Sequence, residues 1–512
     1  MSDSDQTPAA PNDNLSSAWS AIEDFDAPPI EALFAAEPDR TDSLTVDVAG
    51  MHFDWSKTHL DKDLVEAFVA LAEAAGLKEK RRALFAGEIV NPSEGRSATH
   101  VAERGEGAAE DNELAARFRG RMRSLIDAIE AEAFGEIDAI LHIGIGGSAL
   151  GPALAVDALG RGGTKLDLRT VANIDGEAMD EALVGLDPGT TLIVAVSKTF
   201  TTTETLANVE SALDWLNGAG IEDPMAQVVA VTANPEKAIG FGVDETRILP
   251  FSENVGGRYS LWSSVGVSIA LALGWDAYEA MLEGAAAMDR HFKLAPLTEN
   301  APVLAAFCDL YYRHNRDAET RALFAYDERL RLLVPYLQQL VMESNGKGVT
   351  ADGRVLDRPS SAVLWGGVGT DAQHAVFQLL HQGSVLVPVE FIAVTENEDS
   401  QDPRQHRQLL LNAFAQGAAL MTGRDHDDPA RAYPGDRPST TILLERLDPH
   451  TLGALIAFYE HRTYVEAALL GINPFDQFGV ELGKDMARAV DDPEARDTFD
   501  ASTRALIEKA GL

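Results

Sequence analysis

Short apolar runs alternate with helix-length segments over much of the chain. Between residues 116 and 290 the runs typical of buried strands are AILHIGI, KLDLRTVANI, TLIVAVS and QVVAVTA. Between about 300 and 460 the alternation continues with ALFAYD, SAVLWGGV, SVLVPVEFIAV and TTILLERL. Strands that alternate with helices predict βαβ units and parallel sheets. We therefore expect an α/β fold in which one architecture is used twice.

The same pattern suggests a domain organisation. We expect a first α/β domain over residues 116–290 and a second over 291–460. Residues 1–115 look helical and irregular, since DLVEAFVALAEAAGL is a helix pattern, and residues 461–512 close the chain with helices. A chain of 512 residues exceeds one ordinary core, which agrees with two domains.

Polar residues gather directly after the strand-like run VAV in VAVSKTFTTTET, residues 194–205. The side chains in question are those of Ser197, Lys198, Thr199, Thr201 and Thr202. One hydroxyl is enough to cap a helix, so this group exceeds what capping requires. Ligands bind at the carboxyl ends of parallel strands, and N–H groups and hydroxyls beside a lysine suit a phosphate dianion. The alternative is a threonine-rich turn without a ligand.

A second loop, in ILHIGIGGSALG, also follows an apolar run. Gly144, Gly146 and Gly147 allow positive φ and close backbone approach to an anion, and Ser148 stands where a helix would begin. The spacing also satisfies G-x-G-x-x-A, with acidic residues downstream, so an NAD(P)-dependent oxidoreductase stays an alternative. The P-loop pattern G-x-x-x-x-G-K-[ST] is absent from both loops.

Amino-acid composition limits which binding partners and which cellular compartment are expected. Acidic residues outnumber basic ones by 81 to 42, a net charge of −39, which argues against nucleic acid or an anionic membrane as partner. No run of 18 apolar residues occurs, so no membrane span is expected, and the polar start MSDSDQTPAAPNDN does not resemble a signal peptide. The single cysteine, Cys308, rules out an intramolecular disulfide and fits the cytoplasm.

A candidate general base lies in PYLQQLVMESNGKG, residues 335–348. Pro335 suits the start of a helix and Gly346 its end. Glu343 would then lie in the last turn, at the negative end of the helix dipole, which would raise its pKa as a base requires. Gln339 lies one turn earlier on the same face. The alternative is an exposed terminal glutamate.

TDAQHAVFQLLHQG, residues 370–383, predicts a second capped helix. His374 lies in its first turn, just after a glycine-rich strand exit, and is the candidate functional histidine. His381 lies in the last turn, where a cation complements the helix dipole, and is interpreted as structural. Neither histidine has the spacing of a metal site.

Two further segments carry candidate cations. In ENVGGRYSLWSSVG two glycines precede Arg258, so a permanent positive charge stands where the backbone can approach closely. In NPFDQFGVELGK a helix would place Gln477, Glu481 and Lys484 on one face. A surface Glu481–Lys484 ion pair is the alternative there.

Six segments together resemble the phosphoglucose isomerase family, in the family's order and over residues 143–484. They are GIGGSALGP, SKTFTTTET, ENVGGRYSLWS, VMESNGKG, GTDAQHAVFQLLHQG and FDQFGVELGK. The resemblance implies two sugar-isomerase (SIS) domains, each a doubly wound parallel sheet flanked by helices, and a homodimer. It also implies reversible isomerisation of glucose 6-phosphate and fructose 6-phosphate through an enediol(ate), in glycolysis and gluconeogenesis, without metal or cofactor.

The resemblance implies a role for each candidate. Glu343 would move the proton between carbon 2 and carbon 1, and Arg258 would stabilise the enediolate. His374, donated by the neighbouring subunit, and Lys484 would assist ring opening. The substrate and its phosphate would be held by Gly147, Ser148, Ser197, Lys198, Thr199, Thr202, Gln339 and Gln477.

The chain departs from the family pattern without losing a catalytic group. Asp371 and Ala372 replace the usual Asn-Gly, and Phe478 replaces a tryptophan. A non-catalytic SIS-type sugar-phosphate-binding protein remains an alternative, but it would have no reason to keep Glu343, His374 and Lys484. A metal-dependent isomerase would lose activity in chelator, whereas this chain should not.

Overall fold

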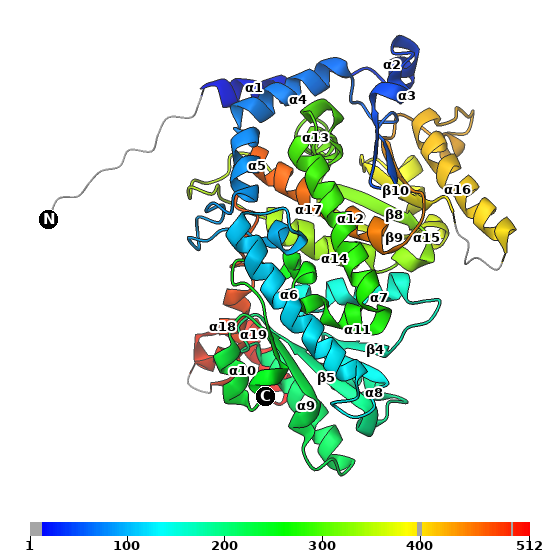
Figure 1. Cartoon of the computed structure of the whole chain (residues 1–512). Helices are drawn as coiled ribbons and strands as arrows, with labels where there is room; N and C mark the ends of the chain where they lie inside the picture. The colour runs from blue at the N-terminus through cyan, green and yellow to red at the C-terminus, as the bar shows by residue number, and fades with distance from the viewer. Residues whose placement is uncertain (1–12, 397–401, 493–494) are drawn as a thin grey trace. The chain divides into compact units, whose positions relative to one another are not determined.

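The structure is a computed structural model that describes residues 13–396, 402–492 and 495–512. The chain divides into two compact units, residues 1–474 and residues 475–512, and each is described by itself. Within the described residues of the first unit, two β-sheets carry the fold (Figure 1).

The first sheet is entirely parallel. Its strands are β3 (Ala139–Ile143), β4 (Asp167–Val171), β5 (Thr191–Val196), β6 (Val228–Thr232) and β7 (Ile248–Pro250). β3, β5 and β6 are buried along their whole length, as strands covered on both faces are. One face packs on α8 (Gly176–Leu183), α9 (Thr203–Gly218) and α10 (Pro235–Phe241). The other α-helices between residues 109 and 294 are α6 (Ala109–Glu130), α7 (Leu150–Leu159), α11 (Val267–Leu273) and α12 (Trp275–Leu294).

Strand order in this sheet locates a ligand-binding edge. The order is β4-β3-β5-β6-β7, so the chain direction across the sheet reverses between β3 and β5. In open α/β sheets, ligands bind beyond the carboxyl ends of the strands at such a switch point. The glycine loop follows β3 and the Ser197–Thr202 loop follows β5, so both predicted anion loops lie at this switch point.

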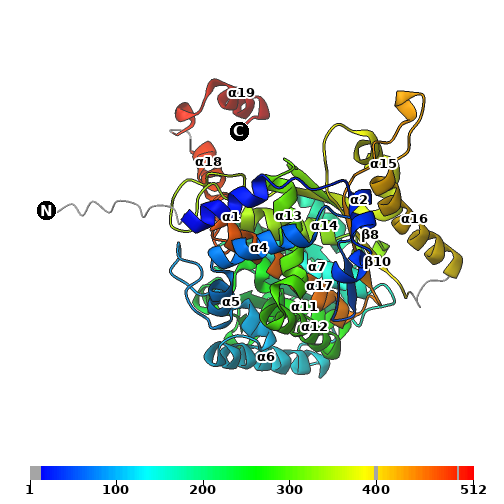
Figure 2. The ribbon, with the colours of Figure 1, turned by 90° about the horizontal axis from the view of Figure 1, so that it is seen from above.

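The second sheet repeats this order. Its parallel part contains β8 (Thr320–Tyr326), β9 (Val363–Val368), β10 (Val389–Val394) and β11 (Ser439–Leu444), ordered β9-β8-β10-β11. One face packs on α15 (Gly369–Gln382) and α16 (Pro403–Thr422). The strands lie between these helices and α13 (Ala301–His314) (Figure 2). The α/β prediction with parallel sheets is confirmed, and all eight predicted strands are present; β7 was not predicted.

The expectation of only helical and irregular structure near the N-terminus was wrong in one place. β1 (Thr45–Val48) and β2 (Met51–Asp54) form a hairpin, and β2 pairs antiparallel with β11. Ala49 and Gly50 both have positive φ, 52° and 76°, as a two-residue hairpin turn of type I′ requires. A two-stranded hairpin is marginal by itself, so its stability depends on β11, almost 400 residues away. The remaining helices of this region are α1 (Asp13–Glu23), α2 (Ile30–Ala36), α3 (Arg40–Ser43), α4 (Lys62–Ala74) and α5 (Leu77–Phe85).

The central helix α17 (Pro449–Leu470) is buried from Thr451 to Leu470 and packs against α12 and α13. It nevertheless carries four acidic, basic or histidine residues in its buried part: Glu460, His461, Arg462 and Glu466. Buried charges require partners, and these are found. Arg104 donates to Asp289 at 2.7 Å and to Glu460 at 2.5 Å.

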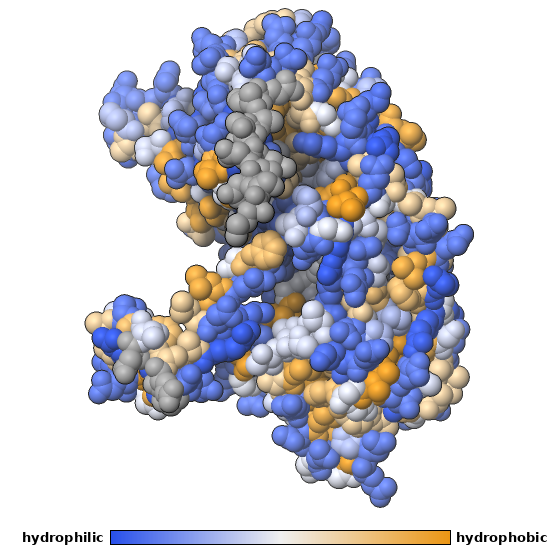
Figure 3. All heavy atoms as spheres, turned by 90° about the vertical axis from the view of Figure 1, so that its left-hand side faces the viewer, coloured by the Kyte–Doolittle hydropathy of each residue, from blue (hydrophilic) through white to orange (hydrophobic). Residues whose placement is uncertain are grey.

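The unit of residues 475–512 contains α18 (Glu481–Asp491) and α19 (Ala501–Ala510). No helix among the described residues has the length and apolar content needed to cross a membrane. On the face shown in Figure 3, hydrophilic side chains cover most of the surface and hydrophobic ones form scattered patches. That surface agrees with the net charge of −39.

Candidate active site

The glycine loop after β3 touches two other predicted segments. A Cβ atom on Gly147 would lie 2.1 Å from the carbonyl oxygen of Gly257 and 2.5 Å from the amide nitrogen of Arg258. Gly146 has φ +57°, and a Cβ there would lie 2.7 Å from Nε2 of Gln339. Only glycine permits these approaches. The loop is therefore packed directly against Arg258 and Gln339.

A histidine that no sequence motif singled out holds this loop. His142, on β3, is fully buried; its Nε2 lies 2.7 Å from the carbonyl oxygen of Ser148 and its Nδ1 2.8 Å from Oγ of Ser268. Burial lowers the pKa of His142 to about 4, so the ring is neutral near pH 7. Because a carbonyl oxygen only accepts, Nε2 carries the proton and donates, and Nδ1 accepts from the serine hydroxyl. The sequence offers one signal for this role, since His142 is the only polar residue in the apolar run AILHIGI.

The Ser197–Thr202 loop is tightly folded. Oγ of Ser197 accepts from the N–H of Phe200 at 3.1 Å and lies 3.0 Å from Oγ1 of Thr202. Phe200 has φ +51° and packs into the core with 3% of its surface exposed. Thr202 occupies the N-cap position of α9, yet its side chain makes no cap hydrogen bond. The first N–H groups of α9 are thus not capped by that hydroxyl, as an anion-binding helix start requires.

Lys198 and Thr199 complete this loop. The ammonium of Lys198 donates to the carbonyl oxygen of Val255 at 3.0 Å, three residues before Arg258. Burial, and then the charge of Arg96, lowers the pKa of Lys198. Thr199 is exposed, with its hydroxyl 2.8 Å from that of Thr201. The lysine therefore links the Ser197–Thr202 loop to the segment that carries Arg258.

The carboxylate of Glu343 is held by two donors. Nη1 of Arg258 lies 2.6 Å from Oε1, and Nε2 of Gln339 donates to Oε2 at 2.9 Å. The side chain of Glu343 is 24% exposed, whereas that of Arg258 is 4% exposed. Arg258 is fixed further by Oγ of Ser344 at 2.6 Å and the carbonyl oxygen of Pro474 at 2.5 Å. A partly accessible carboxylate thus stands beside an immobilised guanidinium.

The helix that carries Glu343 is not the continuous α-helix we expected. α14 runs from Leu333 to Gln338, and Gln339–Glu343 form a π-helical turn, η10. The amide–carboxylate bond confirms that Gln339 and Glu343 share a face. The apolar pattern of the sequence did not indicate this π-turn, and such turns occur frequently at functional sites.

The structure does not join His374 to this cluster. It is exposed in the second turn of α15, not in the first as expected, because the helix begins at Gly369. No hydrogen bond among the described residues connects its ring to Glu343 or Arg258. His381 instead lies 2.9 Å from Oε1 of Gln416, in agreement with a structural role. Gln477 and Lys484 belong to the separately described unit of residues 475–512, so their place in the site stays a prediction. The expectation that one helix carries Gln477, Glu481 and Lys484 was wrong, because α18 begins at Glu481 and Gln477 precedes it.

No group of three or more His, Cys, Asp or Glu side chains in the described parts of the chain is arranged to hold a metal ion. The chemistry available in the first unit is a carboxylate, a guanidinium, an amide and two loops rich in N–H groups and hydroxyls. Together with the parallel sheets, this set defines an α/β enzyme suited to acid–base chemistry on a phosphorylated substrate.

Known proteins agree with this class. The sequence profile of the family described as phosphoglucose isomerase matches residues 54–507. The chain is 63% identical over 493 residues to the glucose-6-phosphate isomerase of Rhizorhabdus wittichii, covering 96% of this chain and 98% of that protein. The corresponding enzyme of Zymomonas mobilis is 56% identical over 496 residues, with 97% and 98% covered. The crystal structure of a glucose-6-phosphate isomerase from Chlamydia trachomatis matches with a TM-score of 0.87 at 31% identity, covering 95% of this chain and 98% of that one.

The chain belongs to the phosphoglucose isomerase family. The resemblance drawn from six sequence segments is thereby confirmed, as is the conclusion that the protein is an isomerase.

Proposed function

We propose that this protein interconverts glucose 6-phosphate and fructose 6-phosphate, a step of glycolysis and gluconeogenesis, with Glu343 as the transferring base. The observation that carries the proposal is the Glu343 carboxylate, partly accessible and held between Arg258 at 2.6 Å and Gln339 at 2.9 Å. The relatives that share 56–63% of its sequence are named for this isomerisation. We further propose a cytoplasmic location, supported by the single buried thiol of Cys308.

Each step of the reaction has a candidate residue. The phosphate binds at the switch point of the first sheet, on the glycine loop with Gly147 and Ser148 and on the loop with Ser197, Lys198, Thr199 and Thr202. Its binding energy holds the sugar while the chemistry occurs several bonds away. Glu343 then removes the proton from carbon 2 and returns it to carbon 1.

Negative charge develops on the sugar oxygen as that proton leaves. Arg258 is permanently charged and already fixed in position, so it stabilises the oxyanion without reorganising. Gln339 orients the carboxylate through its amide, and Gln477 would contact the sugar from the C-terminal unit. No external oxidant or reductant is needed, because the oxidation of carbon 2 is balanced by the reduction of carbon 1 and the two electrons of the C–H bond stay within the substrate.

Ring opening is assigned to His374 and Lys484, with His374 provided by a second subunit. Its exposure on α15, outside the Glu343 cluster, supports a role across a homodimer interface. Mixing inactive Glu343→Gln and His374→Ala chains tests this. Random exchange makes half of the dimers hybrids with one intact site of two, so roughly a quarter of wild-type activity should return. Demonstrated exchange without recovered activity would place both residues in the same chain's site.

We also propose the two α/β domains over residues 116–290 and 291–460. The first sheet lies at residues 139–250 and the parallel strands of the second at 320–444, in support of that division.

The direct test of the base is the Glu343→Gln variant. It should retain binding of a hexitol 6-phosphate, because the phosphate loops are intact, yet lose exchange of the carbon-2 proton with solvent deuterium. Exchange at a near wild-type rate in this variant would mean that another residue is the base.

A further inference from the structure

The turn that carries Glu343 is anchored at its two following residues. Ser344 and Asn345 are both fully buried. Oγ of Ser344 binds Nε of Arg258 at 2.6 Å and lies 3.0 Å from the hydroxyl of Tyr259. Asn345 points the other way, toward α17. Its Nδ2 donates to the carbonyl oxygen of Thr463 at 3.0 Å and to Oε2 of Glu466 at 3.1 Å.

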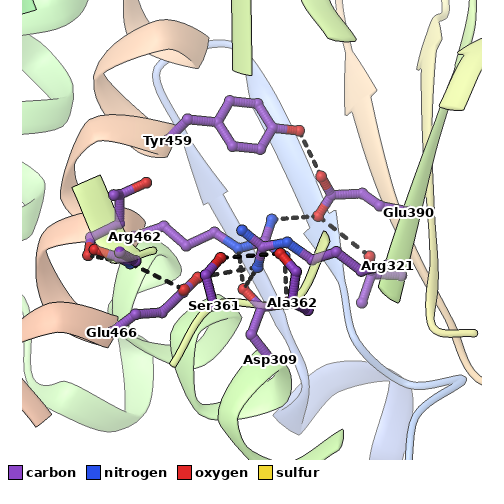
Figure 4. Close-up of polar contacts among 11 residues, drawn as sticks. Asp309, Arg321, Ser361, Ala362, Glu390, Tyr459, Arg462 and Glu466 are labelled. Atoms are coloured by element: carbon purple, nitrogen blue, oxygen red, sulfur yellow. Dashed lines mark hydrogen bonds and ion pairs between the residues drawn. The ribbon is translucent and has the colours of Figure 1, made fainter. Parts of the chain in front are cut away.

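Glu466 is the end of a buried ionic network between α17, α13 and the second sheet (Figure 4). Its other oxygen, Oε1, lies 2.9 Å from Nη1 of Arg321 on β8. The same nitrogen binds Asp309 of α13, and Asp309 accepts two bonds from Arg462, at 2.6 and 2.7 Å. Arg462 continues to Glu390 of β10 at 2.6 Å, and Glu390 accepts from the hydroxyl of Tyr459 at 2.5 Å.

The network fixes Glu466 rigidly. It connects four elements of the core, α17, α13, β8 and β10, through charge-assisted hydrogen bonds, which are the stronger ones. A misplaced partner would leave a charge buried without compensation. Glu466 is 4% exposed and its rotamer is determined by Arg321 on one side. On the other side its oxygen faces Asn345, two residues after Glu343.

We propose that Glu466 is a positioning residue of the isomerisation: through Asn345 it sets the place of the π-turn that carries Glu343. The proposal rests on the proposed function, in which Glu343 is the base. Consecutive Cα atoms are about 3.8 Å apart, so a shift of Asn345 moves Glu343 with it. A base displaced by about 1 Å loses roughly a hundredfold in rate. Substrate binding through the loops of the first sheet does not pass through this contact.

The matched control lies in the same network. Glu390 is buried like Glu466, and its carboxylate binds Arg462 and Tyr459, but it has no contact with Asn345. Glu466→Leu and Glu390→Leu therefore remove the same group from one network and differ in the link to the Glu343 turn. Glu466→Gln retains an oxygen that accepts from Asn345. Asn345→Ala cuts the link without removing a charge.

The experiment measures kcat, KM and the inhibition constant of a hexitol 6-phosphate on the full chain. Glu466→Leu and Asn345→Ala should each lower kcat roughly ten- to a hundredfold, with KM and the inhibition constant within about twofold of wild type. Glu466→Gln should keep kcat within about threefold, and so should Glu390→Leu. Because both residues act through one contact, the Glu466→Leu/Asn345→Ala double variant should be no slower than the slower single variant.

Wild-type kcat in a folded Glu466→Leu variant, or multiplying losses in the double variant, would overturn the proposal. If Glu466→Leu does not fold, Asn345→Ala tests the proposal in its place, because a wild-type kcat in that variant would also overturn the proposal. Glu343→Gln is assayed in parallel. Full activity of that variant would refute the proposed base itself, whereas its inactivity beside an active Asn345→Ala would refute only the positioning.

Discussion

The buried network around Glu466 should make the stability of the protein depend on pH near neutrality. It contains three carboxylates, Asp309, Glu390 and Glu466, and two guanidiniums, those of Arg321 and Arg462. With all five groups ionised, one negative charge is left uncompensated in the core. Burial, opposed by Arg321 and reinforced by Asp309, raises the pKa of Glu466 from 4.5 to about 7.

The sign follows from proton binding. Between pH 4.5 and about 7 the folded chain keeps the Glu466 proton while the unfolded chain has lost it. Stability from this group is therefore complete below pH 4.5, falls as the pH rises, and is lost once the pH passes the folded pKa. A difference of this size corresponds to roughly 3 kcal/mol in the free energy of unfolding, of which about 2.5 kcal/mol should appear between about pH 5 and about pH 8.

Glu466→Gln removes the titration and keeps the shape. The free energy of unfolding, from urea transitions of both proteins, should shift in favour of the variant by about 2–3 kcal/mol on going from about pH 5 to about pH 8. Glu113→Gln on the exposed face of α6 is the control, and its difference from wild type should change by less than about 0.5 kcal/mol. The infrared difference spectrum near pH 5, wild type minus Glu466→Gln, should also contain the protonated-carboxyl band of Glu466.

A stability difference that stays flat across this range would refute the reasoning. The reasoning would also be refuted if the free energy of unfolding of the wild type rose relative to that of the Glu466→Gln variant as the pH rises. Either result would mean that Glu466 is ionised throughout and that the excess charge is balanced elsewhere.

Three other predictions concern the site. Thr202→Val removes the hydroxyl beside Ser197 and should weaken hexitol 6-phosphate binding by about 1–3 kcal/mol in titration calorimetry, while equal weakening of the unphosphorylated hexitol would indicate damage to the fold instead. Gly147→Ala places a methyl group 2.1 Å from the carbonyl oxygen of Gly257, so activity should be lost even where circular dichroism stays native; an active variant would show that the loop moves at little cost. His142→Leu should raise KM more than it lowers kcat, because it releases the carbonyl oxygen of Ser148. In His142→Asn the amide can still donate to that oxygen, so KM should return part of the way to the wild-type value. Equal KM values in both variants and wild type would contradict the role of His142 in holding the glycine loop.

The sequence alone determined the features that are specified by residues adjacent in the chain. Eight strands were predictable because buried parallel strands are continuous apolar runs, and the loops after β3 and β5 because their glycines and hydroxyls are adjacent in the chain. Glu343 and Gln339 were assigned to one face from their spacing. Family membership followed from six such local segments.

Tertiary structure decided what depends on partners distant in sequence. Arg258 and Glu343 are 85 positions apart, and no periodicity indicates that they pair. The hairpin of β1 and β2 is stable because β2 pairs with β11. The charged residues of α17 would suit a solvent-exposed helix face. Arg462 and Glu466 are instead buried, because α13, β8 and β10 supply the oppositely charged groups that pair with them. Burial and pairing are properties of the assembled core, since a charge is tolerated there only when several elements supply its counter-charges together.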